Sequence, residues 1–165
     1  MSDNVYLGNP NLKKANTPIE FTEEQIIEFV QCQRDPVYFA NKYVKIVSLD
    51  EGLVSFSPYR FQEKLINNFH ENRFNICKMP RQTGKSTTVV SYLLHYAIFN
   101  DSVNIGILAN KAATARELLG RLQTAYENLP KWMQQGIMVW NKGSLELENG
   151  SKILAASTSA SAVRG

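Results

Sequence analysis

Apolar residues recur every three to four positions in five stretches of the chain, a spacing typical of amphipathic helices. The predicted helices cover residues 22–34, 37–47, 58–69, 85–99 and 112–128. The first has strong boundary signals, because Thr22 and Gln25 have capping-box spacing and Asp35-Pro36 disfavours continuation of the helix. The pattern therefore places most of the chain in short helices with one apolar face.

Five other segments are typical of strands. Residues 53–56 and 74–77 are short apolar runs, and 103–109 is almost continuously apolar, as in a strand buried on both faces. Residues 144–148 alternate strictly, and Asn149-Gly150 is a type I′ turn signal followed by a second run at 152–156. A β-hairpin is therefore predicted near the C-terminus.

The order of these elements predicts the fold class. From residue 74 to 128 the chain reads strand, helix, strand, helix, which favours an α/β fold with a parallel sheet flanked by helices. Residues 1–18 have no period and predict a flexible N-terminal arm. We divide the remainder into an N-terminal helical region, 19–56, and the first part of the main α/β domain, 57–165.

Composition excludes few classes of protein. A chain of 165 residues suits one domain, and its net charge of +3 permits contact with nucleic acid without arguing for it. The chain has no apolar run of 18 residues and no signal-peptide pattern, so no membrane association is expected. Cys32 and Cys77 lie in apolar segments and are predicted to be buried free thiols, and two histidines argue against a metal site.

The chemistry of the chain is concentrated in the segment 78–87, Lys-Met-Pro-Arg-Gln-Thr-Gly-Lys-Ser-Thr, between a predicted strand and a predicted helix. This is the context of a P-loop, in which backbone N–H groups and the helix N-terminus bind phosphate oxygens. Lys85 would reach the β- and γ-phosphates, and the Ser86 hydroxyl would bind Mg²⁺. Met79 occupies the position of the motif's first glycine, so an ordinary strand–helix turn remains an alternative.

Several local strings, in this order, resemble the N-terminal part of the large terminase subunit of tailed bacteriophages, most closely the myovirus type. The resemblance runs from about Asp35 to Gly165, and an Arg-Gln-Thr-Gly-Lys-Ser motif without the first glycine is usual in that family. The strings that carry it are Asp35-Pro36-Val37-Tyr38-Phe39, Arg60-Phe61-Gln62, 81–86, 106–111, 139–144 and Ala162-Val163-Arg164-Gly165.

The resemblance implies a P-loop NTPase fold of the ASCE or RecA-like type, with ATP and Mg²⁺ as cofactors. The parent protein would be an ATPase and endonuclease, a molecular motor that hydrolyses ATP, translocates double-stranded DNA into the procapsid and cuts the concatemer. Its implied partners are DNA, the phage portal protein, the small terminase subunit and further copies in a ring on the portal. The implied location is the host cytoplasm.

The resemblance also assigns residues. Gln62 matches an adenine-recognising glutamine, and Tyr59 is a candidate for stacking on the base. Arg81 is a candidate γ-phosphate sensor, and Arg164 a candidate trans finger. Catalytic roles therefore fall on Lys85, Arg81 and Arg164. The nucleotide-binding set is Tyr59, Gln62, Arg81, Gln82, Thr83, Gly84, Lys85, Ser86 and Thr87, with Ser86 as the metal ligand. Residues 110–116 match a region that carries DNA-contacting or coupling groups in related translocases, although a solvated helix start explains them equally well.

One departure from the family pattern bears on activity. The strand ending in the Mg²⁺-binding aspartate, the following glutamate that activates water, and the nuclease domain would all come after Arg164, and this sequence does not contain them. We therefore expect a fragment, marginally stable in isolation, that binds nucleotide with little hydrolysis. The alternatives are a fragment of a helicase-like DNA translocase and a non-catalytic nucleotide-binding or regulatory module.

Overall fold

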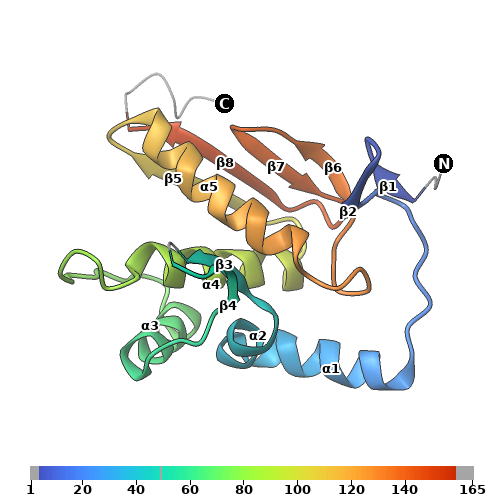
Figure 1. Ribbon diagram of the computed structural model, residues 1–165, viewed down its shortest axis with the longest axis horizontal. Helices are drawn as coiled ribbons and strands as arrows, with labels where there is room; N and C mark the ends of the chain where they lie inside the picture. The colour runs from blue at the N-terminus through green and yellow to red at the C-terminus, as the bar shows by residue number, and fades with distance from the viewer. Residues whose placement is uncertain (1–3, 49, 159–165) are drawn as a thin grey trace.

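The computed structural model describes residues 4–48 and 50–158, which form an α/β fold (Figure 1). A helical layer built from the first half of the chain lies against one long helix, and a sheet with its own helix lies on the other side. The elements, in chain order, are β1 (Val5–Tyr6), β2 (Asn9–Lys13), α1 (Glu23–Arg34), α2 (Pro36–Tyr43), β3 (Lys45–Ser48), β4 (Gly52–Ser55), α3 (Arg60–Glu71), α4 (Lys85–Phe99), β5 (Asn104–Ala109), α5 (Ala112–Glu127), β6 (Ile137–Trp140), β7 (Ser144–Leu147) and β8 (Lys152–Ser157).

The main sheet is mixed. Its strand order is β5-β8-β7-β6, in which β5 and β8 are parallel and the other two pairs are antiparallel. The predicted hairpin is confirmed as β7–β8, with Leu145 opposite Ile153 and with Gly150 at φ 82° in the turn. The prediction of a parallel sheet is wrong for these strands, because the hairpin and β6 add two antiparallel pairings to the single parallel one.

Only one face of this sheet is covered by a helix within the described residues. Helix α5 packs on β5 and β8, where Ile107 and Ile153 are buried, and Leu145 of β7 is buried opposite Ile153. On the opposite face Leu108 and Leu154 are about half exposed, at 50% and 52%. The prediction that residues 103–109 are buried on both faces is therefore wrong, since successive side chains of a strand point to opposite sides.

Helix α4 forms the centre of the core. Eight of its residues are buried, and it packs against α2 and α3 on one side and α5 on the other. His95 lies in an aromatic cluster, with ring centroids 5.5 Å from Phe39 and 4.8 Å from Phe99. The His95 Nε2 atom lies 2.8 Å from the Cys32 carbonyl oxygen, so α4 is also joined to α1.

Local signals set the boundaries of the first helices. Thr22 and Gln25 form the predicted capping box of α1, and the Asp35 carboxylate accepts hydrogen bonds from the first N–H groups of α2. Helix α2 ends at Tyr43, so the prediction of a helix as far as residue 47 is wrong at its end. Residues 45–48 instead pair with β4, consistent with the strand preference of Ile46 and Val47.

Residues 5–6 and 9–13 form strands, so the prediction of a flexible arm over 1–18 is wrong for this part. Strands β1 and β2 form a hairpin, and Leu12 is buried. The backbone N–H of Ala15 donates to the Ile137 carbonyl at 3.3 Å, and Lys14 forms a parallel bridge with Ile137. The segment after β2 therefore lies beside β6, along the edge of the main sheet.

The carboxylate of Glu148 fixes this N-terminal segment. It accepts hydrogen bonds from the Gly136 N–H at 2.6 Å and the Asn16 N–H at 2.8 Å, and it forms an ion pair with Lys13 at 2.9 Å. Burial raises the pKa of Glu148, but the ion pair and the two N–H donors together outweigh burial and hold the pKa below its usual value.

Residues 74–77 do not form the predicted strand. Phe74 is 82% exposed and Ile76 is fully exposed, and no described strand pairs with this segment. A strand needs a hydrogen-bonding neighbour, so an apolar run without one stays irregular. Cys77 in the same segment is exposed, which contradicts its predicted burial, whereas Cys32 is buried as predicted. In the described part of the chain no helix is long and apolar enough to cross a membrane.

We predict that Glu148→Gln lowers the free energy of unfolding by about 1–3 kcal/mol, because the buried Gly136 N–H and the nearly buried Lys13 ammonium lose a charged acceptor. Urea denaturation at pH 7 measures this. The matched control is Glu146→Gln, on β7, which removes an ion pair to the exposed Lys152 at 3.3 Å and should cost less than about 1 kcal/mol. Equal effects of the two substitutions would contradict the role given to Glu148.

A second prediction concerns pH. Burial lowers the pKa of His95 from 6.5 to about 4, so between these values the unfolded state binds the additional proton. The contribution of neutral His95 is complete above pH 6.5 and falls by about 3 kcal/mol as the pH drops to 4. Denaturation of His95→Gln at several pH values should show a flatter dependence in this window. His70→Gln should weaken the dependence only in part, because the charge of His70, whose ring centroid lies 6.0 Å from that of His95, also lowers the pKa of His95 but is a smaller cause than burial.

Candidate functional site

The loop before α4 is a tight turn with two left-handed residues. Gln82 has φ 61° and Gly84, the residue preceding the helix, has φ 70°. The Thr83 hydroxyl donates to the Pro80 carbonyl at 3.0 Å, and the Thr88 hydroxyl donates to the Gly84 carbonyl at 3.0 Å. These bonds hold residues 80–84 in one compact turn at the N-terminus of a helix.

Gln62 connects this loop to the start of α3. Its side chain is buried, the Oε1 atom accepts from the Tyr59 N–H at 2.8 Å, and Nε2 donates to the Thr83 carbonyl at 3.4 Å. A Cβ at position 84 would lie 2.5 Å from Gln62 Nε2. Glycine is therefore required at position 84 both by its positive φ and by the approach of this side chain.

A cavity of about 570 Å³ lies beside the loop. It brings together most of the predicted nucleotide-binding residues, namely Tyr59, Gln62, Gln82, Thr83, Gly84 and Thr87. The wall opposite the loop was missed by sequence reasoning and consists of Ile46, Ser55, Phe56, Ser57 and Phe61. Of these, only Phe61 had a signal in the sequence, because it adjoins Gln62. The β3–β4 residues carry no motif.

Two aromatic rings lie at the edge of this cavity. Tyr59 is 71% exposed and stacks on Phe61, with ring centroids 5.8 Å apart and an interplanar angle of 11°. Exposed aromatic faces beside polar groups suit a planar ligand, since a flat apolar surface can stack on them. The geometry is therefore compatible with the predicted stacking role of Tyr59 and adds a second ring to it.

Lys85 and Ser86 lie on the other side of the loop. They line a separate cavity of about 150 Å³ between α4, β5 and α5, together with Val89, Val90, Leu93, Ile107 and Leu118. The Lys85 ammonium donates to the carbonyl oxygens of Met79, at 3.0 Å, and Pro80. The structure thus does not bring Lys85 and Ser86 into the same cavity as Gln62.

The remaining predicted residues stand apart. Arg81 is exposed on the loop. Arg164 lies outside the described residues. Within residues 4–48 and 50–158, no group of three or more His, Cys, Asp or Glu side chains could hold a metal ion. Ser86, the predicted metal ligand, is exposed at the start of α4.

These features define an α/β protein in which a Gly-Lys-Ser loop leads into a buried helix. Residues 76–165, more than half of the chain, match the family model described as "Terminase large subunit, T4likevirus-type, N-terminal". The chain therefore belongs to this family of the viral DNA-packaging terminases.

A solved structure supports the fold. The large terminase of bacteriophage HK97 is similar to this chain with a TM-score of 0.64 and 16% sequence identity. The match covers 81% of this chain and 29% of the HK97 protein. The chain thus spans less than a third of that relative, and at this identity the likeness concerns the fold alone.

We predict that Gly84→Ala lowers the free energy of unfolding by roughly 2–3 kcal/mol. An alanine is strained in the left-handed conformation, and its Cβ would displace the Gln62 side chain. Thermal or urea denaturation measures the loss. Gly120→Ala is the matched control, since a Cβ there meets nothing within 4 Å and helix α5 should gain about 0.5–1 kcal/mol. A neutral Gly84→Ala substitution would show that the loop conformation is not required.

Proposed function

We propose that this chain is the ATP-binding part of a terminase large subunit and that the loop 80–86 binds the phosphates of Mg·ATP. The observation that carries the proposal is the close approach of Gln62 to the Gly84 position, beside a cavity of about 570 Å³ that Gln62 and the compact loop before α4 both line. The membership of the terminase family supports it. The loop itself supports it through its left-handed residues, which are typical of phosphate-binding turns.

The helix N-terminus, Lys85 and Ser86 would each bind a different part of Mg·ATP. The N-terminus of α4 has no acidic residue in its first turn, so its positive end is free to attract phosphate. Lys85 would exchange the carbonyls of Met79 and Pro80 for phosphate oxygens. Ser86 would supply one oxygen ligand to Mg²⁺, the other ligands being phosphate and water.

The base would lie in the cavity between the loop and the β3–β4 hairpin. The Gln62 amide makes one hydrogen bond at each end within the protein, from the Tyr59 N–H and to the Thr83 carbonyl, which leaves one N–H and one oxygen lone pair for the base. The exposed rings of Tyr59 and Phe61 would cover the flat face of the base. This assigns adenine recognition to residues from α3 and the loop.

The proposal extends to the longer protein. There, ATP hydrolysis would drive double-stranded DNA into the procapsid in the host cytoplasm, with Arg81 and Arg164 neutralising charge at the γ-phosphate. The parent chain would also cut DNA and work in a ring with the portal protein and the small terminase subunit. The residues of this chain alone would bind ATP with little turnover.

Lys85→Ala should weaken ATP binding about 10- to 150-fold, because it removes a charged donor to phosphate. Isothermal titration calorimetry with a non-hydrolysable ATP analogue in excess Mg²⁺ measures the change. Lys64→Ala, at an exposed position on α3, is the control and should bind as the wild type does. Ser86→Ala should weaken binding in Mg²⁺ but not in EDTA. An unchanged affinity for Lys85→Ala would refute the site.

A further inference from the structure

The C-terminal end of α4 is capped by side chains from other parts of the chain. The last carbonyl groups of an α-helix have no partner within the helix, and α4 has no basic residue in its last turn that could donate to them. Instead, Gln33 Nε2 donates to the Phe99 carbonyl at 3.4 Å, and Gln135 Nε2 donates to the Ile98 carbonyl at 3.1 Å. Because Ile98 and Phe99 are buried, these carbonyls depend on donors from the protein itself.

Asn149, in the turn between β7 and β8, makes more hydrogen bonds than the other two capping amides. Its Nδ2 atom donates to the Ala97 carbonyl at 2.9 Å and the Asn100 carbonyl at 3.1 Å, and the Ile98 carbonyl lies 3.4 Å away. Its Oδ1 atom accepts from the Ser151 N–H at 3.0 Å. The β7–β8 turn therefore lies against the end of α4 (Figure 1), and both polar atoms of the Asn149 amide are engaged.

Asn149 is followed by Gly150, and this is the only Asn-Gly pair in the sequence. Such a pair is chemically labile, because glycine has no side chain to hinder attack by its backbone nitrogen on the preceding asparagine. The Gly150 nitrogen would form a bond to the side-chain carbonyl carbon of Asn149 and close a succinimide ring. The side-chain nitrogen leaves as ammonia and takes the proton of the attacking nitrogen. Water then opens the ring to aspartate or isoaspartate.

The folded structure opposes this reaction. The Gly150 N–H donates to the Leu147 carbonyl at 3.0 Å, and the Asn149 amide is held against α4 and not turned back towards its own backbone. The Ser102 N–H donates to the Asn149 carbonyl at 3.0 Å, so the turn is also fixed to the loop after α4. The Gly150 nitrogen can therefore attack only after the turn has opened.

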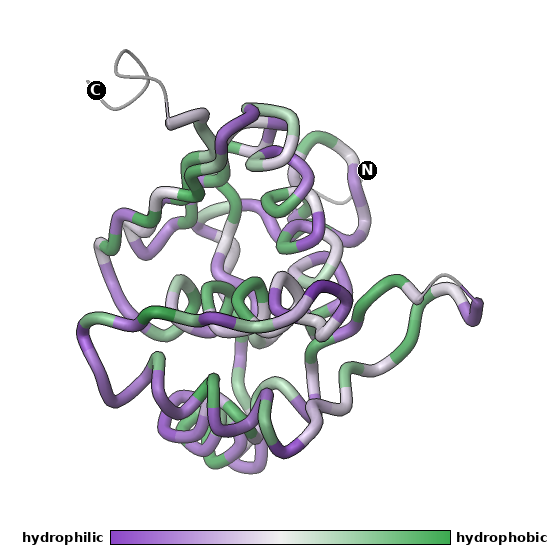
Figure 2. The backbone as a smooth tube through the Cα atoms, turned by 90° about the vertical axis from the view of Figure 1, so that its left-hand side faces the viewer, coloured by the Kyte–Doolittle hydropathy of each residue, from purple (hydrophilic) through white to green (hydrophobic). Residues whose placement is uncertain are grey.

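The product of the reaction cannot restore the cap. An aspartate at position 149 has no N–H to donate to the carbonyls of Ala97 and Asn100, and its charge would lie at the negative end of the helix dipole. Helix α4 begins at the candidate loop, on the side of the molecule that faces the viewer in Figure 2. A weaker cap at one end of α4 would thus destabilise the element that positions the loop at the other end.

We propose that Asn149 is a site of spontaneous deamidation, that the reaction requires opening of the β7–β8 turn, and that it irreversibly weakens the cap of α4. The structure requires this labile pair, because the cap needs an amide donor and the turn needs a positive φ, 82°, at Gly150. The fold protects the pair as long as the turn stays closed. The proposal is independent of the nucleotide site.

The test follows deamidation of the 165-residue chain by peptide-mapping mass spectrometry at mildly alkaline pH, in buffer and in concentrated urea. In urea, Asn149 should deamidate faster than every other asparagine. In buffer its rate should be at least about 10-fold lower than in urea, because the turn must open first. Equal rates in buffer and in urea, or no preference for Asn149 in urea, would overturn the proposal.

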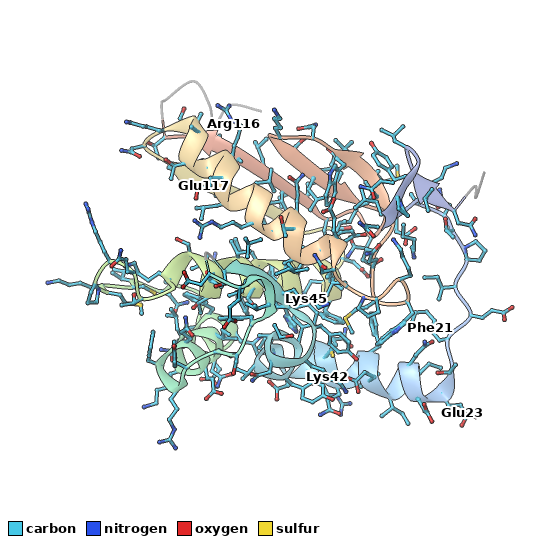
Figure 3. All side chains as sticks on the ribbon, in the orientation of Figure 1. Phe21, Glu23, Lys42, Lys45, Arg116 and Glu117 are labelled. Atoms are coloured by element: carbon cyan, nitrogen blue, oxygen red, sulfur yellow. The ribbon has the colours of Figure 1, made fainter. Side chains whose placement is uncertain are left out.

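The substitution Asn149→Asp reproduces one product and tests the cap directly. In urea denaturation its equilibrium constant for unfolding should be roughly 10- to 100-fold higher than that of the wild type. Asn141→Asp is the matched control, in the β6–β7 turn at the other end of β7, the end of the sheet where Figure 3 labels Arg116. An aspartate there still accepts from the N–H groups of Gly143 and Ser144, so the constant should change less than about 3-fold. Equal effects of the two substitutions would show that Asn149 is not required as a cap.

Discussion

The burial of α4 is the constraint on which the rest of the structure depends. The helix packs on one side against α2 and α3 and on the other against α5, and Leu94 and Ala97 have no exposed surface. The candidate loop is the direct N-terminal continuation of this helix, so its position relative to α3 follows from core packing. The bond from Gln62 to the loop then adds a local restraint to a global one. The packing of the apolar core therefore determines where the loop lies relative to α3.

The parts of the fold that the sequence predicts correctly are those set by neighbouring residues. The capping box at Thr22, the long apolar helix α4 and the Asn149-Gly150 hairpin all depend on signals within a few positions. The hairpin β1–β2 and strand β6 were missed. The contact of the segment after β2 with β6 joins residues more than a hundred positions apart, as in the bridge between Lys14 and Ile137. The contact between Lys13 and Glu148 is an example that no local pattern reveals.

The candidate site likewise has a part that the sequence predicts and a part that it does not. The loop and Gln62 were found through their motif and the family resemblance, and the structure places them in contact. The wall formed by β3 and β4 could not be predicted, since Ile46 and Ser55 have ordinary surface patterns and meet the loop only through the fold. The strand predicted at 74–77 is absent for a related reason. Apolar residues favour a strand, but a strand forms only where a neighbouring strand supplies hydrogen-bond partners.

The Lys85 ammonium donates hydrogen bonds to the carbonyls of Met79 and Pro80. These backbone carbonyls would therefore compete with any anionic ligand for the ammonium group. A ligand that takes over the ammonium gains only the difference between the new contacts and the old ones, and leaves two carbonyl oxygens to be rehydrated. In return, the charge is never left unpaired when the site is empty. These bonds therefore give the loop a defined shape, and under the proposed function the protein's own backbone would lower the affinity for phosphate.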